Sequence, residues 1–413
     1  MPTFKRPGRL PFQGNVYPHQ AFALIEEFRR WIGHQFLADK RSLYRTKSET
    51  KQGIAMALLR ENQPMIDAFD RYESITFGRQ RVPKNFPDNL GDLANVASQY
   101  SVVGPTLDDA TARHHRHSVV GAGYRSTLLE WKTASALART NDALIAWLPP
   151  SSRGPEFIAR AEGQEFEVEC KYVSHMITEL FGDSEAATVA HVIFSQLQSR
   201  GLSGEVHIEV TEEFAALSGE DRVAVVAQSL TNFAAGNSLV EIAGQLRLAS
   251  DLRLADGFAV DAGEWRKGMM RRKEHDARAY GHAVARPPCA VDPITLYMTG
   301  PRRGPLDLLN HVWEVKFKKA AEQCSGDRGA VLAFEWEGIG ETSTFVESDG
   351  MQDLLSRTFS EFPHIAAVVM RCDNSPTRMG GVIDYTTQAY ITRSNVTKFP
   401  RVAELLRFDC PLP

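Results

Sequence analysis

Three residues in the middle of the chain have the side-chain types and the spacing for metal-assisted hydrolysis: Glu156, Glu169 and Lys171. Two carboxylates that face each other repel and therefore favour a bound cation, and Mg²⁺ takes oxygen ligands of this kind. A lysine on the same face can stabilise developing negative charge or orient an attacking water. The three residues predict a divalent-metal site if the fold brings them together.

The pattern around these residues predicts a β-hairpin that does so. From Glu165 to Tyr172 charged and apolar residues alternate, so Glu169 and Lys171 share one face of a strand. Glu162–Gly163 suits a two-residue turn, because glycine tolerates positive φ. In that register Glu156 lies opposite Glu169, with about 5 Å between the Cβ atoms. A three-residue turn would shift the pairing by one residue, so the register is a hypothesis.

The same pattern also fits a solvated sheet face with a surface ion pair between Arg160 and Glu165. Glu-x-Lys is a common pattern, and it occurs four times in this chain. Only Glu169/Lys171 lies in an alternating strand that follows a strand with an acidic residue. The others lie in helical patterns, where residues i and i+2 do not share a face: Glu49/Lys51, Glu130/Lys132 and Glu314/Lys316.

The elements predicted around the hairpin have the order helix, strand, strand, strand, helix, strand. Inside the first helix Glu130 shares a stripe with Ala134 and Leu137 and is expected to point inward. A carboxylate facing a core needs a partner, and a solvated glutamate is the alternative. Apart from the hairpin, the predicted elements are a helix at 124–139, a strand at 143–148, a helix at 185–200 and a strand at 205–210.

This order and these residues resemble the core of the PD-(D/E)xK nuclease superfamily, the restriction-endonuclease-like fold. The resemblance covers about residues 120–212 and identifies a superfamily and not a family. It departs at position 156, where Asp is more usual and the longer Glu would move the metal. Carried over by position, it implies four catalytic residues: Glu156, Glu169, Lys171 and Glu130. It implies that Mg²⁺ or Mn²⁺ is held by Glu156, Glu169 and the main-chain carbonyl of Cys170, joined by Glu130.

The resemblance implies an α/β (α+β) fold with a mixed central β-sheet flanked by helices. It implies a metal-dependent nuclease that hydrolyses phosphodiester bonds of DNA, with RNA left open. The protein is expected to be a restriction or phage-defence enzyme. It is expected to form a homodimer or to act with a partner protein of a defence system. Gln196 or Gln198 on the following helix would support the site or be solvated. The alternative function is a catalytically inactive protein of the same fold that acts as a nucleic-acid-binding or scaffold subunit.

Composition predicts a soluble cytoplasmic protein. Five cysteines without a C-x-x-C pair indicate reduced thiols, and no apolar run is long enough for a membrane span or a signal peptide. The net charge of −4 argues against a protein that coats DNA, although a local basic surface would suffice for an enzyme. The best candidate for such a surface is a basic segment whose phosphate contacts would be Arg266, Lys267, Arg271, Arg272 and Lys273. The other interpretation of this segment is a solvated basic helix or loop.

A chain of 413 residues is expected to form two or three domains. The histidines of His114–His117 are adjacent and diverge along the chain, so we expect a solvated or DNA-facing loop more than a zinc site. No phosphate-binding P-loop or dinucleotide fingerprint is present. The predicted parts are a mostly helical N-terminal region (1–120), a nuclease-like core (121–215), a core extension with the basic segment (216–292) and a C-terminal α/β unit (293–413).

Overall fold

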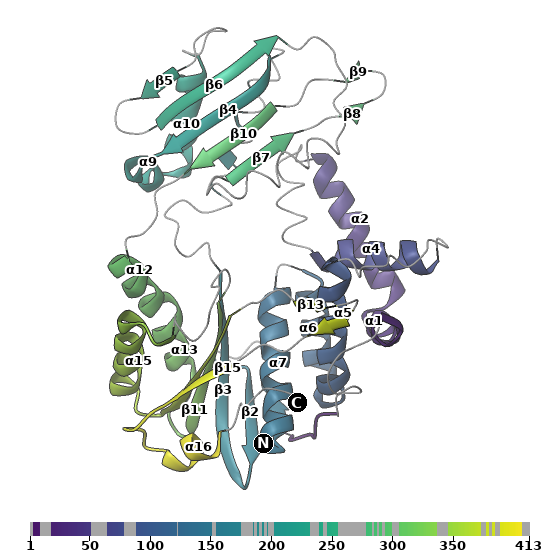
Figure 1. The fold of residues 1–413 in the computed structure, drawn as a ribbon, viewed down its shortest axis with the longest axis vertical. Helices are drawn as coiled ribbons and strands as arrows, with labels where there is room; N and C mark the ends of the chain where they lie inside the picture. Colours follow the sequence, from purple (N-terminus) through teal and green to yellow (C-terminus); the bar gives the residue numbers. More distant parts are fainter. Residues whose placement is uncertain are drawn as a thin grey trace. The chain divides into compact units, whose positions relative to one another are not determined.

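The computed structural model divides the chain into two compact units (Figure 1). One unit comprises residues 1–41, 62–175 and 305–413, and the other comprises 42–61 and 176–304. The structure describes residues 3–8, 18–50, 64–77, 88–121, 123–150, 154–174, 202–231, 239–242, 246–254, 278–282, 285–286, 289–290, 294–299, 305–336, 346–372, 377–379, 382–384 and 389–406, with six residues between 185 and 196.

A six-stranded mixed sheet forms the centre of the first unit, which confirms the predicted α/β class. Its strand order is β1-β2-β3-β11-β12-β15. The first three strands are antiparallel, β3, β11 and β12 are parallel, and β15 is antiparallel to β12. The strands are β1 (Leu144–Trp147), β2 (Phe157–Ala161), β3 (Gln164–Val173), β11 (Gly329–Trp336), β12 (Ile365–Cys372) and β15 (Ala389–Arg393).

The β2–β3 hairpin has the predicted turn and register. Glu162 and Gly163 have φ angles of 47° and 79°, which is the left-handed conformation that both central residues of a type I′ turn require. Arg160 pairs with Glu165, and Phe157 pairs with Val168 at the far end of the ladder. β3 is longer than β2, and residues 169–173 pair only with β11 among the described strands. In the part of the chain that the structure describes, no strand pairs with the other edge of β3 beside Glu169 and Lys171.

Helices cover both faces of this sheet (Figure 1). One face packs against α7 (Tyr124–Asn141), whose residues from 127 to 137 are all buried. The other face carries the connection from the second unit into β11, formed by α12 (Pro305–Val312), the π-helical turn η4 (Trp313–Phe317) and α13 (Lys318–Gln323). The ring of Phe317 stacks on Phe334 of β11 at 4.0 Å. Two further helices of this unit are α15 (Asp349–Glu361) and α16 (Pro400–Leu405).

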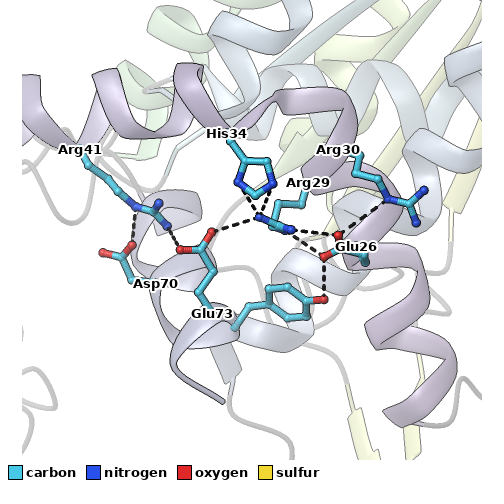
Figure 2. A network of polar contacts seen from close by, with 8 residues as sticks. Glu26, Arg29, Arg30, His34, Arg41, Asp70 and Glu73 are labelled. Carbon is cyan, nitrogen blue, oxygen red and sulfur yellow. Dashed lines mark hydrogen bonds and ion pairs between the residues drawn. The ribbon is translucent and has the colours of Figure 1, made fainter. Parts of the chain in front are cut away.

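The N-terminal region is helical, as predicted, and shares its core with α7. Phe28 contacts Trp131 of α7 edge-on at 6.2 Å. Figure 2 shows a polar network in which buried Arg29 contacts Glu26, Glu73 and His34. The described helices are α1 (Pro18–Ile32), α2 (His34–Thr50), α4 (Pro64–Thr76), α5 (Asp88–Val103), the short 3-10 helix η1 (Gly104–Thr106) and α6 (Asp109–Val119).

The second unit contains a five-stranded sheet of order β5-β6-β4-β10-β7. The described part of this unit includes the helices α9 (Glu212–Ala216) and α10 (Gly219–Thr231). Its strands are β4 (Leu202–Val210), β5 (Leu239–Ile242), β6 (Leu246–Leu254), β7 (Arg278–His282) and β10 (Ile294–Thr299), with the short strands β8 (Ala285–Arg286) and β9 (Cys289–Ala290) nearby in the chain.

The strand predicted at 205–210 exists as part of β4, but it belongs to this second sheet. The strand beside β3 is instead β11. β11 is buried at every residue, as expected for a parallel strand covered on both faces, whereas the residues of β4 alternate in polarity. Local periodicity predicts that a strand exists, but it does not identify the strand with which it pairs.

A predicted boundary also differs. The predicted core 121–215 is divided between the two units near residue 175. Within the helical N-terminal region, Gly33 has a φ of 90° and ends α1. Residues 239–254 contain two strands, β5 and β6, and β15 is preceded by β14 (Val382–Asp384), which pairs with β13 (Thr377–Met379). None of the described helices is long and apolar enough to cross a membrane.

Candidate metal centre

Two acidic side chains on β3, those of Glu165 and Glu167, already form ion pairs or hydrogen bonds with other residues. Glu165 forms an ion pair with Arg160 across the hairpin, as the solvated-face interpretation predicted. Glu167 is buried and accepts hydrogen bonds from the backbone N–H and the hydroxyl of Ser325, both at 2.7 Å. Arg328 lies 3.7 Å from the same carboxylate. Ser325 lies between α13 and β11. Glu167 therefore connects β3 to the end of the helical crossover formed by α12, η4 and α13.

Glu169 differs from both of them. Its side chain is fully buried, and Lys171 donates to its Oε1 atom. Its Oε2 atom is buried without a hydrogen-bond partner among the described residues, which is costly for a carboxylate. Burial and then the nearby charge of Glu156 raise the pKa of Glu169 to about 8, while Lys171 opposes the shift. A solvated sheet face therefore does not describe this end of β3.

Glu156 directly precedes β2 and belongs to the same electrostatic cluster. Its N–H donates to the carbonyl of Val168 at 3.0 Å, and its carbonyl accepts from the N–H of Leu148 at 3.1 Å. The backbone hydrogen bond of Glu156 across the hairpin is thus to Val168, the residue before Glu169. Burial, followed by the charge of Glu130, raises the pKa of Glu156 to about 8. The interaction of Glu156 with Glu169 is between side chains, beyond the end of the paired ladder.

Glu130 of α7 is buried, as its position on the helix predicted. Burial raises the pKa of this carboxyl to about 8, and Lys171 opposes the shift. Its Oε2 atom lies 3.2 Å from Nε2 of His115, whose Nδ1 accepts a hydrogen bond from Trp131 at 2.9 Å. Burial also lowers the pKa of His115 to about 4, so the ring is neutral at physiological pH. The expectation of a solvated loop at His114–His117 was wrong, because this segment lies on α6.

The thiol of Cys170 is fully enclosed between β3 and α7. Burial and the carboxylates of Glu130, Glu156 and Glu169 raise its pKa well above the ordinary value. The thiol therefore stays protonated and packs as a small apolar side chain. Only the backbone of Cys170 would be available to a cation, as the resemblance implied.

Positive groups gather around Tyr172 at the end of β3. Lys316 donates from Nζ to the carbonyl of Tyr172 at 2.8 Å, and the guanidinium of Arg125 lies 5.4 Å from the Tyr172 ring centroid. Burial and then the charge of Lys171 lower the pKa of Lys316. These cations next to buried carboxylates form a site that suits a metal ion and a phosphate together.

The helical pattern around Glu314/Lys316 predicts that this pair is not a Glu-x-Lys site, and the structure confirms that both residues are helical. Residues i and i+2 diverge on a helix, so Glu314 pairs with exposed Lys318 while Lys316 reaches β3. The signal that would have found it is a lysine on an apolar stripe, between Trp313 and Phe317. The same kind of signal applies to His115, a buried polar residue on an amphipathic helix.

The donor set fits a hard divalent cation. The ligands are carboxylate oxygens, one of them has no other partner, and a cation would relieve the repulsion that raises the pKa values of Glu156 and Glu169. Within the described ranges, no three His, Cys, Asp or Glu side chains lie close enough to enclose an ion. Binding would therefore draw Glu156 and Glu130 toward Glu169.

Some predicted residues lie outside the described residues. These are the basic segment Arg266, Lys267, Arg271, Arg272 and Lys273, and also Gln198. Gln196 is described and helical. The structure thus brings together Glu130, Glu156, Glu169 and Lys171 and adds the unpredicted Lys316. No protein-family model matches the chain, and no curated protein matches it in sequence.

Proposed function

We propose that this protein is a Mg²⁺- or Mn²⁺-dependent nuclease that hydrolyses phosphodiester bonds of DNA. The observation that carries the proposal is the state of Glu169. Its carboxylate is fully buried, one oxygen contacts Lys171, and the other has no partner among the described residues. A metal ion would satisfy this oxygen and offset the desolvation of the carboxylate.

The topology of the first unit supports the proposal. Helix α7, the antiparallel strands β1, β2 and β3, the helical crossover α12–α13 and the parallel strand β11 have the order expected for the PD-(D/E)xK superfamily. The last two elements come from residues 305–336 and not from 185–210. On this interpretation residues 176–304 are an insertion into the nuclease core, and a restriction or phage-defence role remains the context that we propose.

The chain's own residues have distinct tasks in this reaction. Glu169 and Glu156 hold the ion, with Glu130 as a third ligand. The bound ion supplies Lewis-acid chemistry and a water of lowered pKa. Lys171 stands beside Glu169 and neutralises charge that develops on the phosphoryl oxygens. Lys316 and Arg125 bind the same phosphate or its neighbour through charge-assisted hydrogen bonds.

Cleavage assays with matched variants test this function. With Mg²⁺ or Mn²⁺ the wild type is expected to cleave plasmid or linear DNA, and Lys171→Ala or Glu169→Gln is expected to lower the rate at least about 100-fold. Glu165→Gln is the control, because it makes the same change on the same strand at a surface ion pair. Equal behaviour of the wild type and both site variants on every DNA and RNA substrate would refute the proposal.

One observation favours the alternative of an inactive nuclease-fold subunit that binds nucleic acid or serves as a scaffold. Glu130 and Glu169 are buried, and no three ligating side chains in the described structure surround an ion position. This alternative predicts DNA binding that neither a chelator nor Lys171→Ala changes. Electrophoretic mobility shifts with and without chelator distinguish the two functions.

A further inference from the structure

We propose that His115 is a positioning residue for Glu130, and that Trp131 holds its imidazole in the tautomer which this task requires. The inference rests on the proposed metal centre and extends it into the N-terminal helices. His115 belongs to α6, which precedes every element of the nuclease-like core. The helical region therefore contributes to the centre itself.

The hydrogen-bond geometry determines which nitrogen of His115 carries the proton. The indole N–H of Trp131 lies 2.9 Å from Nδ1 of His115, and an indole nitrogen is only a donor. Nδ1 must therefore be the unprotonated nitrogen, and the proton of the neutral ring resides on Nε2. The nitrogen that carries the proton is therefore the one that lies 3.2 Å from Oε2 of Glu130.

The imidazole is fixed by its surroundings as well as by its hydrogen bonds. His115 is 3% exposed, and its ring meets the indole of Trp147 edge-on at 4.9 Å. Trp147 is itself held by a hydrogen bond to the hydroxyl of Thr106 at 2.7 Å. The ring of Trp131 lies on another side of the imidazole at 5.8 Å. A donor held in this way fixes the orientation of the carboxylate that it contacts.

A neutral donor suits a carboxylate that must bind a cation. It faces one oxygen of Glu130, leaves Oε1 for a cation, and adds no positive charge that would repel the cation. A lysine or arginine partner would compete with the metal ion. Lys132 lies two residues further along α7, and its ammonium is committed to Glu335 at 2.6 Å instead. His115 therefore controls the direction of Glu130 without placing a positive charge beside the cation site.

Mn²⁺ binding to the full chain, measured by isothermal titration calorimetry, tests this role. His115→Phe removes the donor and is expected to weaken Mn²⁺ binding about 10-fold or more. His115→Gln can still donate to Glu130 and is expected to restore most of the affinity. His117→Phe is the matched control on α6, because His117 is exposed and its ring contact with Phe36 survives the change.

A second measurement reads the tautomer directly. Histidine ¹⁵N shifts of the metal-free protein are expected to show the proton of His115 on Nε2, and Trp131→Phe is expected to change that signature. A proton on Nδ1 overturns the inference, and this holds even if His115→Phe does not fold. Wild-type affinity for Mn²⁺ in a folded His115→Phe overturns it too, provided that Glu169→Gln has lost binding. Failure of the wild type to bind Mn²⁺ instead overturns the proposed function.

Discussion

At the scale of single residues, Glu130, Glu156 and Glu169 share a raised pKa of about 8, with burial as the largest cause for each. The folded chain thus retains protons that the unfolded chain releases near the ordinary value of 4.5. The alternating pattern of β3 predicted that Glu169 and Lys171 share one face of the strand. The burial of Glu130 was predictable from its position on the helix, but that of Glu156 and Glu169 was not, because it depends on α7 and on residues 305–323, far away in sequence.

The raised pKa values predict how stability depends on pH. For a carboxyl with a raised folded pKa, the contribution is fully present below about pH 4.5 and is lost as pH rises toward about 8. Glu169→Gln removes this titration, so its melting temperature relative to wild type should rise steadily from pH 5 to pH 8 in chelator. Differential scanning fluorimetry at each pH measures the difference. A constant difference, equal to that of Glu165→Gln, would contradict the assigned burial of Glu169.

Lys316 is expected to contact the phosphate backbone. Lys316→Ala should weaken DNA binding and reduce the slope of log affinity against log salt by roughly 1, because one phosphate contact is lost. Lys318→Ala is the control two residues away, since Lys318 pairs with exposed Glu314. Fluorescence anisotropy at several salt concentrations measures both slopes. Equal slopes for the two variants would remove Lys316 from the interface.

At the scale of elements, the β2–β3 hairpin was predicted down to its register, because its turn and its alternation are local. Arg160 pairs with Glu165 as the two-residue turn requires. The parallel neighbour of β3 could not be identified in the same way. β4 and β11 both have strand patterns, and only the crossover through α12 and α13 decides which one pairs.

The turn itself gives a stability prediction. Glu162 has a φ of 47°, which is unfavourable for most L-residues and well tolerated by asparagine. Glu162→Asn should raise the free energy of unfolding by roughly 0.5–1 kcal/mol, since Asn-Gly is the preferred type I′ pair. Glu162→Val, which is β-branched, should lower it. Urea denaturation measures both changes, and the opposite order would contradict the turn conformation.

At the scale of the whole molecule, the first unit is assembled from three separate stretches of chain that share one core. The N-terminal helices form part of that core, and Phe28 packs on Trp131, the neighbour of Glu130. The sequence predicted a mostly helical N-terminal region without indicating which core its helices join. Amphipathic helices were evident in the sequence, but the surface that they cover was not.

The network of Figure 2 predicts that damage to the N-terminal helices reaches the sheet. Arg29 is 5% exposed and bonds Glu26 at 2.8 Å, so Arg29→Ala leaves carboxylates without their partner. We expect a loss of roughly 2–3 kcal/mol in unfolding free energy, discounted for the partial exposure of Glu26 and Glu73. Hydrogen exchange at the β3 amides should rise in parallel. Unchanged exchange there would show that the helices unfold independently.

The position of residues 176–304 between β3 and α12 also affects how the protein is made. The hairpin leaves the ribosome early, but Lys316 and β11 follow only after the whole second unit has been synthesised. At a translation rate of roughly 5–20 residues per second, on the order of 10 s pass between the synthesis of Glu169 and that of the crossover which covers it. The nascent chain consequently carries the acidic residues of the centre without their enclosure. Any cleavage activity would begin only after β11 has been synthesised.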